Sequence, residues 1–208
     1  MRYLPCVLLV ACFDRATLDA DLDLGRDTAQ GTLVYSAVTR DDLDGCGSAT
    51  ACVDSLRGAL AKVREEAAAK GATVQSVLAR ESQGMLDIAL AYQSSLGKFD
   101  PHVGELFFVT FDLSKAPGAK GKPAILVGWE NSPALAVSLT GGKQRYIHGL
   151  SRDDGKPFSG FLVEKGKVHL HVEKQPLDEA GNVAPPRSWF AEVPGFTDAA
   201  RAAGLLAP

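Results

Sequence analysis

His169 and His171 are the side chains of this sequence whose spacing most suggests shared chemistry. Residues two apart on a β-strand point to the same face, with Cβ atoms about 7 Å apart, and two imidazoles so placed can begin a transition-metal site. The candidates for a third ligand from a neighbouring strand are His148, Glu164 and Glu173. Val168, Leu170 and Val172 alternate with the histidines and supply a buried face. A solvated strand face is therefore the expectation, with a metal such as zinc as the alternative.

Catalytic signatures of the common kinds are absent from the sequence. It has no Gly-x-Ser-x-Gly elbow, no phosphate loop, no dinucleotide fingerprint and no His-Glu-x-x-His motif. A Ser-His-Asp set can be drawn from Ser151 or Ser159, His148 and Asp153, but such sets can be drawn from almost any sequence. We expect a binding or scaffolding protein without a cofactor. The alternative is an exported metal-binding protein or metal-dependent enzyme that uses His169 and His171.

Cys46 and Cys52 lie six residues apart in the segment DGCGSATAC. Gly45 and Gly47 allow the tight turn that brings two Cα atoms to the separation of about 5.5 Å that a disulfide needs. A single Cys-x₅-Cys lacks the four ligands of a structural zinc site. We expect a disulfide, with two free thiols or a redox switch as the alternatives.

The first twelve residues have the order of a secretory signal, in which one basic residue, Arg2, precedes an apolar run. The segment from Leu9 to Cys12, LVAC, resembles the lipobox of bacterial lipoproteins. The resemblance covers about a dozen residues. It implies cleavage before Cys12, acylation of the Cys12 thiol with chains such as palmitate, and a lipid-anchored protein on the exported side of the cell envelope. A buried strand from Leu4 to Phe13 is the alternative.

The cysteine count is consistent with export. Cys6 would leave with the signal at residues 1–11 and Cys12 would carry the lipid, so that Cys46 and Cys52 remain as a pair in an oxidising compartment. The expected partners are the membrane, through the lipid, and an envelope protein or small ligand. Nucleic acid is not expected, because the net charge is −3 and no overall positive field exists.

Length and composition predict one folded domain. The 208 residues are 46% hydrophobic and 23% charged, close to the averages for globular proteins, and no run of 18 apolar residues occurs. Residues 12–30 are interpreted as an acidic segment next to the anchor, and residues 31–208 as a single β-rich domain. The predicted fold class is α+β, a mostly antiparallel β meander of about 8 to 11 strands.

Periodicity places the main elements. A long amphipathic helix is expected near residues 51–70, capped by Thr50, and a short C-terminal helix from Thr197. Alternation over residues 85–93 after Ser82-Gln83-Gly84 predicts a hairpin with residues 73–81. Hairpin turns are also expected at residues 140–143 and 165–167. Residues 78–111 and 162–193 share a similar layout of strands and turns, which suggests a weak internal duplication.

Overall fold

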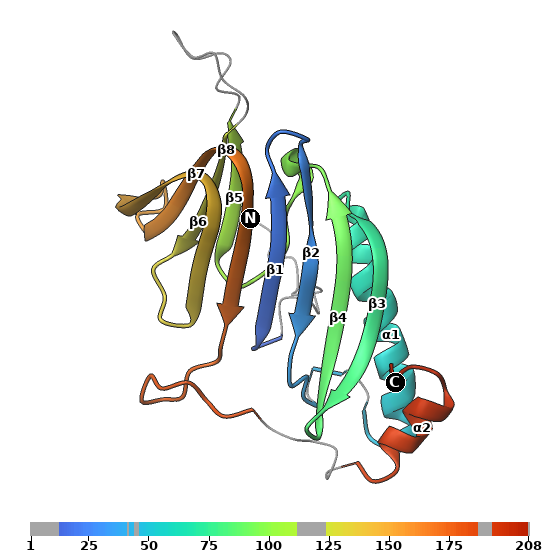
Figure 1. Ribbon diagram of the computed structural model, residues 1–208. Helices are drawn as coiled ribbons and strands as arrows, with labels where there is room; N and C mark the ends of the chain where they lie inside the picture. The colour runs from blue at the N-terminus through green and yellow to red at the C-terminus, as the bar shows by residue number, and fades with distance from the viewer. Residues whose placement is uncertain (1–12, 41, 44–45, 112–123, 187–192, 208) are drawn as a thin grey trace, which may run out of the picture.

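The computed structural model describes residues 13–40, 42–43, 46–111, 124–186 and 193–207. In these residues one antiparallel sheet of eight strands carries helices on one side (Figure 1). The strands are β1 Ala16–Asp23, β2 Thr28–Tyr35, β3 Thr73–Ser82, β4 Met85–Ser94, β5 Leu106–Phe111, β6 Ala124–Glu130, β7 Leu135–Ser151 and β8 Pro157–Lys174. The helices are α1 Ala49–Ala69, α2 Phe196–Ala202 and a 3₁₀ turn η2 Leu96–Lys98. The predicted α+β class and the mostly antiparallel sheet are confirmed.

The strands are arranged as hairpins in a non-sequential order, so the predicted meander is wrong. The order is β3-β4-β2-β1-β8-β6-β5, with β7 paired to β8. Along one edge β8 pairs with β7 over almost its whole length, and along the other its two halves pair with β6 and β1. Alternation in a sequence shows which residues share a face, but it does not show which strands pair.

β7 and β8 are continuous strands of 17 and 18 residues, although the sequence predicts hairpin turns inside both. Gly141, Gly142 and Gly166 have positive φ angles of 83°, 60° and 99° and bend the strands without reversing them. A Cβ at Gly166 would approach the Cα of Gly142 to 2.9 Å, so this crossing requires glycine. Residues 162–174 therefore form no hairpin like β3–β4, and the predicted duplication has no structural counterpart. Residues 187–192 of its second copy lie outside the described residues.

The expected domain boundary at residue 31 is also wrong, because it falls inside β2. The acidic residues before it form β1, which pairs with β2 on one side and β8 on the other. Ala16, Leu18, Ala20 and Leu22 are buried on the helix side, and the alternating aspartates point to the opposite side. Residues 16–30 are thus β1 and the beginning of β2, in the middle of the sheet, and not a segment leading to it.

α1 packs along β3 and β4, with α2 beside its first turns (Figure 1). One long amphipathic helix near residues 51–70 is not supported in that form, because α1 has 21 residues, begins at Ala49 and shares the helical layer with α2. Ser48, not Thr50, caps α1, since its Oγ accepts from the backbone N–H of Ala51 at 3.3 Å. Gly195, not Thr197, precedes α2. Within the described residues, neither helix combines the length and apolar character needed to cross a membrane.

Candidate functional site

His169 and His171 face solvent on the open side of the sheet, as the sequence predicts. Val168, Leu170 and Val172 are at most 3% exposed on the other side. The register of β1 and β8 places His171 opposite Asp19 and His169 opposite Asp21. On the open face, therefore, each of the two histidines of β8 lies beside an aspartate of β1.

Each of these histidines is held by carboxylates. His171 Nδ1 lies 2.6 Å from Asp19 Oδ1, and its Nε2 lies 3.3 Å from Glu173 Oε1. His169 Nδ1 lies 3.0 Å from Asp21 Oδ1. The hydrogen bond to Asp19 raises the pKa of His171, against a smaller opposing effect of partial burial, and the bond to Glu173 raises it further. Both ring nitrogens of His171 are therefore placed to donate, which favours the imidazolium.

The candidate third metal ligands do not converge on this pair. His148 Nδ1 instead contacts Ser159 Oγ at 2.9 Å, and Glu164 pairs with Lys143 at 2.5 Å. Glu164 is displaced because β8 does not turn back at residues 165–167. Glu173 alone reaches His171, but as a hydrogen-bond acceptor. Within the described ranges, no three His, Cys, Asp or Glu side chains are arranged to hold a metal ion.

His148 and Ser159 meet, but not as a catalytic pair. Ser159 donates to Asn131 Oδ1 at 2.6 Å, so its oxygen is left to accept from His148 Nδ1. Ser159 is only 2% exposed. No hydrogen bond or ion pair joins Asp153 to His148 among the residues that the structure describes. The hydroxyl of Ser159 in β8 is a buried link to β7 and to Asn131 just after β6, and no described residue positions it as a nucleophile.

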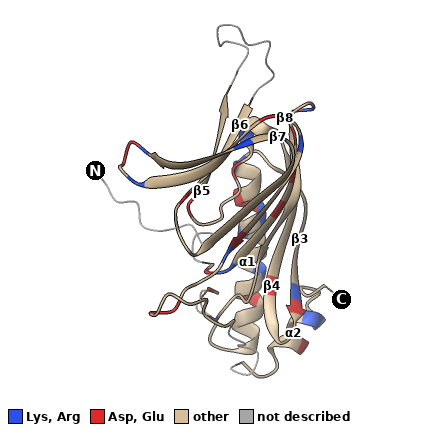
Figure 2. Cartoon of the chain, turned by 60° about the vertical axis from the view of Figure 1, so that its left-hand side comes forward, with Lys and Arg blue, Asp and Glu red and all other residues tan. Residues whose placement is uncertain are grey.

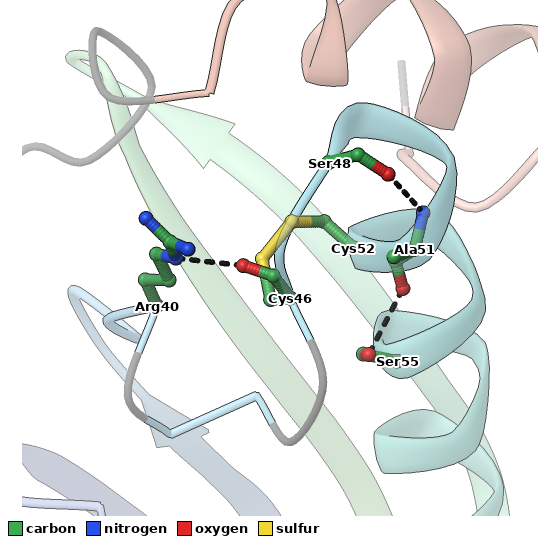
Figure 3. Close-up of a disulfide and its surroundings, with 6 residues drawn as sticks. All are labelled: Arg40, Cys46, Ser48, Ala51, Cys52 and Ser55. Carbon is green, nitrogen blue, oxygen red and sulfur yellow. Dashed lines mark hydrogen bonds between the residues drawn. A yellow bond between two sulfur atoms is a disulfide. The ribbon is translucent and has the colours of Figure 1, made fainter.

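Cys46 and Cys52 form the predicted disulfide, with their Cα atoms 4.2 Å apart (Figure 3). Cys52 lies in the first turn of α1, and its backbone N–H donates to Ser48 O at 2.8 Å. Arg40 Nε donates to Cys46 O at 2.6 Å. The bridge fixes the start of α1 to the loop that leads from β2. The other site residue predicted from the cysteine pattern, Cys12, lies outside the described residues.

A recess between α1 and the sheet was not predicted from the sequence. About 50 Å³ of it is accessible to a water-sized molecule, and about 510 Å³ is empty space if the open solvent at its mouth is included. Its apolar walls come from β2, α1, β4 and the segments after them, and they are Leu33, Val63, Ala67, Ala72, Leu90 and Phe99. Tyr35 and Tyr92 add their rings to these walls, and polar side chains, among them Glu66 and Ser94, complete the lining; this space is here called the Tyr92 recess.

The polar groups along the wall include two tyrosine hydroxyls, the Glu66 carboxylate and the Ser94 hydroxyl, which donates to Ser95 O at 3.2 Å. Tyr92 is 4% exposed, and its buried hydroxyl has no hydrogen-bond partner among the described residues. Burial raises the pKa of both tyrosines; Glu66 raises that of Tyr35 further, and Tyr35 raises that of Tyr92. The Glu66 carboxylate therefore acts on the Tyr35 hydroxyl and Tyr35 on the Tyr92 hydroxyl, and both hydroxyls stay protonated near neutral pH.

Charged side chains surround the mouth of the Tyr92 recess. Lys70 Nζ lies 3.4 Å from His102 Nδ1 and 3.9 Å from Asp100 Oδ2. Lys98 packs over Gly71, where a Cβ would meet its Cδ at 2.8 Å. The half-buried Glu66 has no hydrogen bond or ion pair from its carboxylate to any described residue. Both signs of charge are interspersed along the chain (Figure 2), and at the mouth Asp100 is the acid that pairs with Lys70.

One signal for this recess exists in the sequence. Tyr92 continues the alternation of Leu86, Ile88 and Leu90, which predicts a tyrosine on the buried face of a strand. Nothing in the sequence shows that β2 lies beside β4 and brings Tyr35 next to it. No protein-family model, curated protein or solved structure matches the chain. The candidate site is therefore argued from its own geometry.

Proposed function

We propose that the protein is a lipid-anchored binding protein of the bacterial cell envelope, and that the Tyr92 recess is its ligand site. The observation that carries the ligand site is the buried Tyr92 hydroxyl without a partner. Leaving such a group unsatisfied costs about 1–3 kcal/mol, and buried polar groups in folded proteins nearly always have partners. The hydroxyl is covered by side chains, so a ligand that displaces them and hydrogen-bonds to it would recover that free energy on binding.

The exported location is supported by two features that do not depend on the recess. The LVAC segment ending at Cys12 resembles a lipobox. The Cys46–Cys52 disulfide belongs to a class of bond that persists in oxidising compartments. Cys12 acylation would give the anchor, and two or more acyl chains hold a protein stably on a membrane.

Such an anchor would hold the domain close to the bilayer. Phe13 is already part of the core, 4% exposed and stacked on Tyr35 with ring centroids 4.5 Å apart. Its carbonyl accepts from Lys174 Nζ at 3.0 Å, and β1 begins at Ala16. A lipid on Cys12 would therefore be followed directly by folded chain. Tyr35 also lines the Tyr92 recess, so the ligand site would lie one side chain away from the anchored end.

Replacing Tyr92 with phenylalanine tests the ligand site. The change removes the unsatisfied hydroxyl and keeps the ring, so Tyr92→Phe should raise the free energy of unfolding of ligand-free protein by about 1 kcal/mol. Tyr146→Phe is the matched control, because Tyr146 is 53% exposed, and it should stay within about 0.5 kcal/mol of wild type. Urea unfolding followed by circular dichroism measures both. A loss of stability in Tyr92→Phe would mean that the hydroxyl has a partner and that the recess is ordinary core.

Mass spectrometry of the protein from membranes tests the anchor separately. The expected mature chain begins at Cys12 and carries acyl chains, whereas Cys12→Ser gives an unprocessed or lipid-free form. Cys6→Ser is the matched control, since Cys6 lies inside the expected signal and its replacement should leave processing unchanged. An intact Met1 with no lipid mass in wild type would contradict the anchor and leave the ligand site to its own test.

A further inference from the structure

The Tyr92 recess carries information about the chemistry of what it binds. Resting on the proposed function, we infer that its ligand is a small primary amine with a short apolar or aromatic body, its ammonium group directed to Glu66. Glu66 is half-buried on the wall of the recess, and its carboxylate has no hydrogen bond or ion pair to any described residue. An ionised carboxylate can only accept hydrogen bonds, so its natural complement is a donor that carries positive charge.

The remaining polar groups of the wall fit the same ligand. The Tyr92 hydroxyl has no partner and can accept a hydrogen bond as well as donate one. Burial and Glu66 both favour the protonated form of Tyr35, so neither tyrosine supplies a competing negative charge. Tyr35, Tyr92 and Phe99 contribute aromatic rings to the lining, and aromatic rings attract organic ammonium groups.

The charged side chains at the mouth of the recess do not reverse the preference for an amine over other ligands. Lys70, the residue after the end of α1, does not pair with Glu66 four residues before it, because it contacts Asp100 and His102 instead. An anionic ligand would bring its own charge beside Glu66, where like charges repel. A neutral alcohol could satisfy Tyr92 but would leave the carboxylate of Glu66 without a partner. The apolar walls and the small volume of about 50 Å³ limit the enclosed part of the ligand to a short chain or the edge of a ring.

Three probes of similar size separate these possibilities. They are 2-phenylethylamine, 2-phenylethanol and 3-phenylpropionate, titrated into full-length protein at neutral pH while the methyl NMR signals of Val63 and Leu90 are followed. The amine should bind at least tenfold more tightly than the carboxylate, a difference of about 1.4 kcal/mol. Glu66→Gln should weaken the amine about tenfold and bring its affinity to that of the alcohol. Glu65→Gln is the matched control, because Glu65 is the preceding residue on α1 and is exposed, and it should change nothing.

The outcomes separate the ligand class from the ligand site. Equal affinities for the three probes, or an amine affinity that Glu66→Gln leaves unchanged, would overturn the amine while the recess remained a binding site. If none of the three probes shifted the methyl NMR signals of Val63 and Leu90, the proposal of an amine ligand would also be overturned. The stability of Tyr92→Phe then decides whether the proposed function fails as well.

Discussion

The two faces of the sheet differ in whether their polar side chains have hydrogen-bond partners. On the open face His171 and Asp19 lie directly opposite each other and satisfy each other by a hydrogen bond of 2.6 Å. On the helix-covered face the Tyr92 hydroxyl is buried without a partner among the described residues, and Glu66, which lines the same recess, has no ion pair to the described residues. Residues that look chemically active in the sequence are thus occupied with one another, whereas the groups left open for a ligand come from an apolar strand and a helix. A site is better located by which polar groups lack partners than by which residue types stand out.

The largest expected difference between the two faces of the sheet is in how much a substitution lowers the free energy of unfolding. Leu170 is fully buried between the two histidines in sequence, so Leu170→Ala should cost about 2–5 kcal/mol through lost burial and a cavity. Replacing His169 and His171 together with alanine should cost less than about 1 kcal/mol, because exposed ion pairs contribute little. Urea unfolding measures both variants.

Metal binding by His169 and His171 would remove this expected difference in stability between the two faces. The same unfolding experiments with added zinc and with a chelator should give the same results for wild type and for the double histidine variant. A gain in stability with zinc that occurs only in wild type would show that the histidines hold a metal, because binding to the native state alone adds to its stability.

The next effect concerns the disulfide that fixes α1 over the recess. Cys46→Ala combined with Cys52→Ala should lower the free energy of unfolding by about 2 kcal/mol, at the low end for disulfides because the loop is short. The matched control is oxidised against reduced wild type, which should differ by a similar amount. Alkylation of both cysteines in unreduced, denatured protein would show instead that the bridge does not form.

The smallest effect is a pH dependence on the open face. The pKa of His171 is raised in the folded protein, so its protonated form contributes stability that is fully present below the unfolded pKa of about 6.5 and is lost as the pH rises through the folded-state pKa. The contribution should be at most about 1 kcal/mol, because the side chain is 36% exposed. An NMR titration of Asp19→Asn should show a lower pKa for His171. Asp21→Asn, which removes a partner of His169, is the control and should leave the pKa of His171 high.

Local pattern predicts much of the sheet. Alternation and a turn sequence identify the β3–β4 hairpin, and Gln83 and Gly84 indeed have positive φ angles of 52° and 76°. The same alternation predicts the buried side of residues 168–172. The spacing of Cys46 and Cys52 predicts their disulfide. These features depend on residues that are close in sequence, where geometry follows from residue type.

The features that could not be predicted from the sequence depend on contacts between strands that are far apart in the chain. Glycine with positive φ serves both a hairpin turn and a bent strand, so Gly142 and Gly166 could not distinguish two short strands from one long one. β1 pairs with β8 across nearly the whole chain, and no local signal requires it. The Tyr92 recess combines β2, α1 and β4 in the same way, which is why only the structure brings Tyr35, Glu66 and Tyr92 together.

Filling the Tyr92 recess tests the central claim most directly. Ala67 lines the recess, and Ala67→Phe places a ring in it, whereas Ala61→Phe adds the same ring to the exposed side of α1. Binding of 2-phenylethylamine, followed by the Val63 and Leu90 methyl signals, should be lost in Ala67→Phe and retained in Ala61→Phe, with both variants folded by circular dichroism. Equal binding by the two folded variants would show that the ligand binds elsewhere and would contradict the assignment of this recess.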